Sequence, residues 1–109
     1  MTPQGVLTTI AGTGIPELRN GPVALAGFVN PEGIAIDADG NLFIGDLSNS
    51  VVRKITPAGE VSTFAGSQRG FGNGLASIAR FNEPSGITVD RSGNIYVADV
   101  NNERIRKIQ

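Results

Sequence analysis

Two pairs of oxygen-bearing side chains recur at matched positions in the 109-residue chain. Asp46 is followed three residues later by Asn49, and Asp99 is followed three residues later by Asn102. Carboxylate and amide oxygens are the ligands that a cation such as Ca²⁺ prefers. Asp and Asn at the end of a strand also accept hydrogen bonds from the amides of a turn. The pattern therefore predicts either a cation site or, more simply, a pair of turns.

A third acidic stretch, Asp37-Ala38-Asp39-Gly40-Asn41, has part of the pattern of a calcium-binding loop. It lacks the remaining ligands and the final Glu of such a loop. Its later counterpart, Asp90-Arg91-Ser92-Gly93-Asn94, has only one carboxylate. We therefore interpret both stretches as loops between two strands, closed by a glycine in the left-handed conformation.

The composition excludes most catalytic chemistry. The chain has no His and no Cys, which removes Cys/His zinc sites, thiol nucleophiles, Ser-His-Asp triads and histidine acid/base groups. No other nucleophile or base stands out from the remaining polar residues. We expect no catalytic residue, no metal site and no cofactor.

Basic residues gather at Arg53-Lys54 and at Arg104, Arg106 and Lys107. Neighbouring strand residues point to opposite faces, so each Arg-Lys pair is divided across its sheet. We expect these side chains to cover apolar edges and to pair with carboxylates between neighbouring sheets. Nine Lys and Arg against ten Asp and Glu, with six aromatic residues, argue against a nucleic-acid partner.

No apolar run has the length of a membrane span, and the first residues lack the pattern of a signal peptide. We therefore expect a soluble protein without a membrane partner, cytoplasmic if it is expressed as it stands. Its native compartment is not encoded in these features.

An internal repeat organises the whole chain. Residues 28–55 recur as residues 81–108 with 12 of 28 positions identical, and residues 2–12 recur as residues 56–66. Each unit, about 2–55 and 56–108, contains four short segments rich in β-forming residues. The expected strands are Gly33–Asp37, Leu42–Asp46, Val51–Ile55 and Val6–Ala11, with Gly86–Asp90, Ile95–Asp99, Arg104–Ile108 and Glu60–Ala65 as their counterparts. Four-stranded units with a period near 50 residues predict an all-β fold, a β-propeller.

The motifs resemble NHL repeats. They are Pro-x-Gly-Ile-x-(Ile/Val)-Asp, Gly-Asn-(Leu/Ile)-(Phe/Tyr)-(Ile/Val)-x-Asp, Asn-x-x-(Val/Ile)-Arg-Lys-Ile and (Val/Leu)-x-Thr-x-Ala-Gly, each present twice. The resemblance implies a six-bladed propeller that serves mainly as a binding platform. Enzymes among the relatives use His-bound zinc or an asymmetric calcium cluster, and this chain has no His to supply the first.

Two blades cannot bury their own sheet faces, because repeat units of this kind need neighbours on both sides. The chain begins with a fourth strand and ends with a third, so we expect one copy to complete a blade of the next. A homotrimer would give six blades, and we favour it over an eight-bladed tetramer. The two strands expected to close the ring between copies contain Val6, Leu7, Thr8, Thr9 and Ile10, and Arg104, Ile105, Arg106, Lys107 and Ile108.

We therefore predict a self-assembling scaffold without catalysis, and its tidy two-repeat length favours an engineered or excised fragment. The alternative is a module that binds a protein or small ligand through the face carrying the long connections Gly12–Glu32 and Gly66–Ser85. These connections could instead only seal the gaps between blades. The candidate binding residues on this face are Arg19, Asn20, Asp46, Asn49, Arg69, Asn73, Asp99, Asn102 and Glu103.

Overall fold

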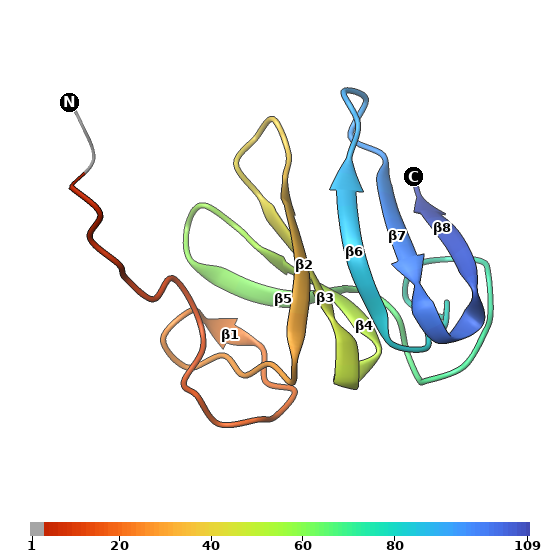
Figure 1. The fold of residues 1–109 in the computed structure, drawn as a ribbon, viewed down its shortest axis with the longest axis horizontal. Coiled ribbons are helices and arrows are strands. Elements are labelled where there is room, and N and C mark those ends of the chain that lie inside the picture. Colours follow the sequence, from red (N-terminus) through yellow and green to blue (C-terminus); the bar gives the residue numbers. More distant parts are fainter. Residues whose placement is uncertain (1–3) are drawn as a thin grey trace.

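The computed structural model describes residues 4–109, which form two antiparallel β-sheets standing side by side (Figure 1). The first two residues of the predicted unit 2–55 lie outside the described residues. The first sheet has the order β1-β5-β4-β3-β2 and the second has the order β6-β7-β8. The elements are β1 (Gly21–Pro22), β2 (Pro31–Ile36), β3 (Leu42–Asp46), η1 (Leu47–Asn49), β4 (Val51–Ile55), β5 (Glu60–Ala65), β6 (Pro84–Val89), β7 (Ile95–Asp99), η2 (Val100–Asn102) and β8 (Arg104–Ile108).

The predicted all-β fold is confirmed, and β3, β4, β5, β7 and β8 have the predicted bounds. Strands β2 and β6 begin two residues earlier than expected. Pro31 already pairs with Asp46, and Pro84 with Asp99, each across a β-bulge that shifts the register before the regular ladder begins. The two-residue strand β1 was not predicted.

The sheets are offset from the sequence repeats by one strand. β5 belongs to the second repeat unit, yet it pairs with β4 of the first, with Arg53 opposite Thr63. The second sheet has no counterpart of β5 among residues 4–109. The segment predicted as a strand at Val6–Ala11 forms no strand within the single chain, and it runs on the opposite side of the first sheet from β8 (Figure 1). Its pairing with another copy stays a prediction.

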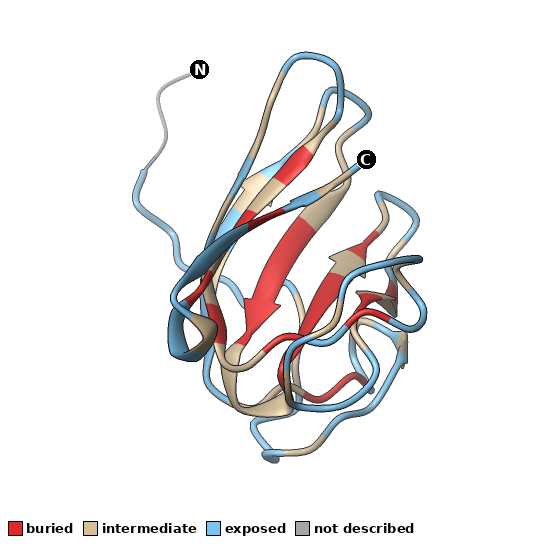
Figure 2. Ribbon diagram, turned by 90° about the vertical axis from the view of Figure 1, so that its right-hand side faces the viewer, coloured by how far each residue is buried: buried red, intermediate tan, exposed pale blue. Residues whose placement is uncertain are grey.

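One apolar core lies between the two sheets, where buried residues occupy the middle of the strands (Figure 2). A second, smaller cluster of Ala26, Ile44, Ile55 and Val61 is buried on the other side of the first sheet. Each sheet has two faces. The front face carries Ile44 and Arg53 in the first sheet and Val97 and Arg106 in the second. The back face of the first sheet packs against the front face of the second. The residues buried in this contact are Phe43, Val52 and Ala65 from the first sheet, and Phe81, Ile95 and Val97 with the second.

Gly45 lets the two sheets approach closely. A Cβ atom at this position would lie 2.5 Å from the carbonyl oxygen of Ser85 and 3.0 Å from that of Pro84, both on β6. These neighbours are backbone atoms, so they cannot turn aside as a side-chain end would. Ala98 occupies the same repeat position in the second sheet, on the back face, which no other sheet formed by residues 4–109 covers.

Gly45→Ala is expected to lower the free energy of unfolding by about 1 to 3 kcal/mol, because the added methyl group must push β6 away from β3. Chemical denaturation measures the loss. Gly72→Ala is the matched control, since its Cβ would lie 3.7 Å from Arg80, an ordinary contact. Equal stability of the two variants would contradict the close packing at Gly45.

Candidate functional site

A buried ion pair joins the end of β3 to β4. Asp46 pairs in register with Val51, and Arg53 lies two residues further along β4 on the same face. The Arg53 guanidinium donates to Asp46 Oδ2 at 2.7 Å, and both side chains are fully buried. Asp46 Oδ2 also accepts from Asn49 Nδ2 at 2.7 Å, and its Oδ1 accepts from the Val29 amide at 2.8 Å.

The same guanidinium holds the long connection that precedes β2. It donates to the carbonyl oxygen of Gly27 at 2.7 Å, to that of Arg19 at 2.9 Å and to Asn20 Oδ1 at 2.8 Å. Its carbon lies 4.6 Å from the centroid of the Phe28 ring. One side chain therefore ties together two strands and both ends of a loop, which a planar fork of five donors can do.

The second sheet repeats this network group by group. Arg106 donates to Asp99 Oδ2 at 2.6 Å, to the carbonyl oxygens of Arg80 and Gly72, and to Asn73 Oδ1 at 2.9 Å. Asp99 also accepts from the Asn82 amide and from Asn102 Nδ2. The repetition shows that the network belongs to the repeat itself.

The network corrects two sequence-based expectations. Asp46 and Asp99 accept no capping hydrogen bond from the backbone amides of the turns η1 and η2 that follow them. They accept instead from a loop amide, an Asn and an Arg, so their oxygens already have partners. Arg53 and Arg106 pair within their own sheet, because the hairpin places the carboxylate diagonally opposite. The signal that was missed is an Asp followed seven residues later by an Arg, present in both units.

The loops at Asp37 and Asp90 are strand-to-strand turns, as expected. Asp37 Oδ1 accepts from the amides of Asp39 and Asn41, and Asp90 makes the equivalent bonds. Gly40 closes its loop with φ of 86°. The Asn41 side-chain amide, first among several donors, lowers the pKa of the Asp37 carboxyl. Residues 4–109 contain no group of three or more His, Cys, Asp or Glu side chains that could hold a metal ion.

The nine predicted binding residues divide into two kinds. Asp46, Asn49, Asp99 and Asn102 lie buried or half-buried in the two networks, and Asn20 and Asn73 accept from the network arginines although they reach the surface. The side chains of Arg19, Arg69 and Glu103 are exposed. Arg69 lies 3.6 Å from Glu83 and donates to the carbonyl oxygen of Ser48. Ligand binding by this face stays a prediction.

Equivalent positions of the two repeats differ most in exposure where a sheet lacks a neighbour. Val52 on the back face of the first sheet is 0% exposed, whereas its counterpart Ile105 on the second sheet is 74% exposed. Val61 in β5 is 2% exposed, whereas its counterpart Leu7 is 97% exposed. The same side-chain type is thus buried where a sheet or strand is present and bare where it is absent.

The front face of the first sheet is the second sheet face that no neighbouring sheet of residues 4–109 covers. Ile34 and Ile36 of β2 are exposed there, while their counterparts on β6 are partly buried by the first sheet. A shallow apolar cavity of about 260 Å³ crosses this face. Its lining includes Leu42, Ile44 and Ile55 of the sheet and Thr8, Ile10 and Ala11 of the N-terminal segment. Within residues 4–109, no helix is long and apolar enough to cross a membrane.

Asp46→Asn is expected to lower the free energy of unfolding by about 3 to 5 kcal/mol, because it leaves the buried Arg53 guanidinium without a counter-charge. Thermal or chemical denaturation measures the loss. Asp39→Asn, the same change at an exposed carboxylate, should shift the stability by about 0.5 kcal/mol or less. A loss at Asp46 no greater than at Asp39 would refute the role given to the ion pair.

The chain has a single tyrosine, so its ultraviolet titration reports Tyr96 alone. The phenol donates to Asp90 Oδ2 at 3.1 Å, and this bond raises the Tyr96 pKa above its ordinary 10.0. The stabilisation is present below pH 10.0 and is lost as pH rises through the raised value. Asp90→Asn should bring the midpoint back toward 10.0, while Asp37→Asn should leave it unchanged. An identical midpoint in all three proteins would contradict the hydrogen bond.

Comparison with known proteins matches both repeat units to families. The model described as "NHL repeat" matches residues 81–108. A model described as "Strictosidine synthase-like, N-terminal" matches residues 23–54, which include most of the same repeat positions in the first unit.

Similar proteins cover most of this chain. NHL repeat-containing protein 2 of Bos taurus is 33% identical over an alignment 119 residues long, which covers 96% of this chain and 16% of that protein. Protein SUPPRESSOR OF QUENCHING 1, chloroplastic, of Arabidopsis thaliana is 35% identical over 81 residues, 72% of this chain and 8% of that protein. A solved structure from Bacteroides thetaiotaomicron, described as an auxiliary nutrient binding protein, superposes with a TM-score of 0.85 at 28% identity.

That superposition covers 92% of this chain and 28% of the solved one. The chain therefore spans less than a third of each of these proteins. Repeated motifs, a strand of the second unit that completes the sheet of the first, and these relatives lead to one conclusion: the chain belongs to the NHL-repeat β-propeller family.

Proposed function

We propose that the 109-residue chain is a scaffold that assembles with copies of itself, head to tail, into a closed propeller. Each sheet is then one blade. The observation that carries this proposal is the contrast between Val52, buried against the second sheet, and Ile105, exposed at the same repeat position. The back face of the second sheet lacks the neighbour that the back face of the first sheet has.

The contact inside the chain is a template for the contact between copies. In it, Phe43 and Val52 on a back face meet Ile95 and Val97 on a front face. The free back face offers Tyr96 and Ile105, the counterparts of the first pair. The free front face of another copy has Leu42 and Ile44 at the positions of the second pair. Ile44 is already buried in the single chain, so Ile34 and Ile36 beside it are the side chains that this face leaves exposed. Unlike surfaces at the two ends of a subunit give a heterologous contact, which closes into a ring where the rotation permits.

A ring of three copies gives the six blades that the family resemblance implies, and a ring of four gives eight. We favour three. Burial of one exposed isoleucine stabilises such a contact by about 1.5 to 3 kcal/mol. The free front face has Ile34 and Ile36 exposed, and the free back face has Ile105. A closed ring of either size leaves no sheet face bare, so the choice of three rests on the family resemblance.

The proposed role is structural and not catalytic. The side chains with the strongest chemistry, Asp46, Arg53, Asp99 and Arg106, are engaged in holding the long connections to the sheets. An asymmetric cluster of the kind that a catalytic calcium site needs would be repeated three times around such a ring. These points support a scaffold as the function of the chain.

The assembly is expected to have three times the 11.3 kDa mass of the chain, as measured by native mass spectrometry or light scattering. Ile105→Glu should convert most of it to monomer, because the carboxylate would have to be buried against the next front face. A wild-type monomer would overturn the proposal.

Ile78→Glu is the matched control. Ile78 belongs to the unit of the second sheet, whose front face packs on the first sheet, and Ile78 is exposed. Its counterpart Leu25 belongs to the unit of the first sheet, whose back face packs on the second sheet, and Leu25 is exposed as well. The position is therefore bare whichever neighbour is present, and Ile78→Glu should keep the assembled mass. Dissociation by both variants alike would point to a general effect of added charge and would contradict the specific contact.

A further inference from the structure

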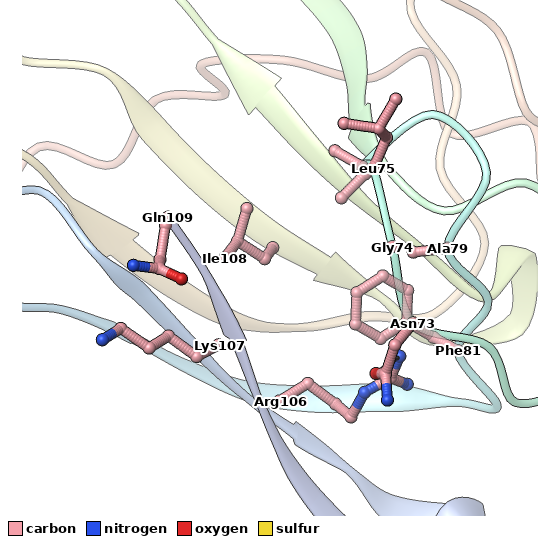
Figure 3. A pocket seen from close by; sticks show the side chains of 11 residues that line it. Asn73, Gly74, Leu75, Ala79, Phe81, Arg106, Lys107, Ile108 and Gln109 are labelled. Atoms are coloured by element: carbon pink, nitrogen blue, oxygen red, sulfur yellow. Dashed lines mark hydrogen bonds between the residues drawn. The ribbon is translucent and has the colours of Figure 1, made fainter.

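A cavity of about 360 Å³ lies at the outer edge of the second sheet (Figure 3). One side is β8 and the residue after it, with Lys107, Ile108 and Gln109. The other side is the loop at Gly74 and Leu75. Ala79 and Phe81 also line the cavity, as do Asn73 and Arg106 of the buried network. We call this cavity the edge slot.

The first sheet has a strand in the equivalent place. β5 lies between β4 and β1, with Val61 opposite Ile55 on one side and opposite Gly21 on the other. The counterparts of Ile55 and Gly21 are Ile108 and Gly74, which line the edge slot. The slot is therefore the position of a fourth strand, the counterpart of β5, which the second sheet lacks among residues 4–109.

The slot keeps the polar groups that hold β5 in the first sheet. There, Asn20 Nδ2 donates to Thr63 Oγ1 at 3.3 Å while Asn20 Oδ1 accepts from Arg53. In the slot, Asn73 Oδ1 accepts from Arg106 in the same way. This bond orients the Asn73 amide group as Asn20 is oriented, with its nitrogen available to a threonine on an incoming strand.

One segment of the chain has the sequence of the missing strand. Gly5-Val6-Leu7-Thr8-Thr9-Ile10-Ala11-Gly12 corresponds to Gly59-Glu60-Val61-Ser62-Thr63-Phe64-Ala65-Gly66. It has an aliphatic residue at the position of Val61, a threonine at that of Thr63, and the same Ala-Gly at its end. Leu7 and Ile10 are exposed in the single chain.

The anchoring of the segment shows which sheet it fits. β5 leaves the first sheet and is then anchored to the second, where the Gly66 amide donates to the Ala76 carbonyl oxygen. The Gly12 amide donates to the Val23 carbonyl oxygen in the same way, which anchors its segment to the first sheet. By this equivalence, Val6–Ala11 belongs in a sheet that stands in front of the first. Residues 4–109 form no sheet there.

We propose that Gly5–Gly12 of a second copy adds to β8 as an antiparallel strand and fills the edge slot, with Leu7 opposite Ile108, Thr8 opposite Lys107 and Thr9 opposite Arg106. This register rests on the proposed assembly and assigns its strand contacts. Main-chain hydrogen bonds to β8 supply the pairing, and the side chain of Leu7 enters the place that Val61 has in the first sheet. The Thr9 hydroxyl accepts from the Asn73 amide.

A cysteine pair tests the register, because the chain has no cysteine of its own. In the full chain carrying Thr8→Cys and Lys107→Cys, the two residues face each other across copies at a distance that a disulfide spans. Mild oxidation should convert most of the protein into covalent multimers, up to a trimer, that reduction returns to single chains. Denaturing gel electrophoresis with and without reductant measures the conversion.

The control pairs Thr8→Cys with Arg104→Cys, three residues further along β8 and about 10 Å out of register. That distance exceeds the reach of a disulfide, so the control should yield only traces of multimer. The mass of each reduced variant is measured in parallel. Assembled protein that links only in the Lys107 variant supports the proposed register.

Two results would overturn it, and they are distinguishable. Assembled protein that fails to link, or that links equally in both variants, would reject the strand in the edge slot while leaving the assembly intact. Reduced protein with the mass of a single chain would reject the assembly and the strand contact together.

Discussion

The buried ion pair between a β3 or β7 aspartate and a β4 or β8 arginine is the interaction on which each sheet depends. A guanidinium taken out of water must have nearly all its donors paired, or its desolvation is not offset. Arg53 meets this demand with one carboxylate, two loop carbonyls and an asparagine. The arginine can therefore be buried only if the long connection folds back over the end of the hairpin.

That requirement places the apolar residues that seal the space between sheets. With the connection held at Gly27, Phe28 follows directly and stacks against the Arg53 guanidinium. Phe81 takes the equivalent place in the second unit and is buried in the contact between the two sheets. The polar network and the apolar core thus depend on each other, because the loop that accepts the hydrogen bonds of the arginine also supplies an aromatic ring to the core.

The order of strands in the repeat leaves each unit unable to form a complete sheet from its own residues. A fourth strand precedes the three strands of its own unit, so it enters the neighbouring sheet, as β5 does. Each sheet consequently shares a strand, a face and a loop anchor with the next. Within two units, the outermost strand and sheet faces therefore have no neighbour to pack against. Equivalent residues such as Val61 and Leu7 consequently differ widely in exposure.

Strand positions followed from the sequence because they depend on local pattern. Alternation, turn glycines and a repeat present twice defined five strands to the residue, and they also divided Arg53 from Lys54 across the sheet. The bulges at Pro31 and Pro84 were not predicted, because an early residue can rejoin the ladder only when its partner strand is in place. The short β1 was missed for the same reason, since Gly21 is a strand residue only beside Val61.

The sequence by itself determined the family, the all-β fold, the repeat phase and the residue types available for chemistry. Only the tertiary structure decided what those residues do. Asp46 and Arg53 are seven positions apart, and nothing local distinguishes a carboxylate that binds a cation or a turn from one buried under a loop. The difference is made by the connection from Arg19 to Val29, which reaches the pair only when the whole unit is folded. Burial is a property of the assembled chain, and charge chemistry follows burial.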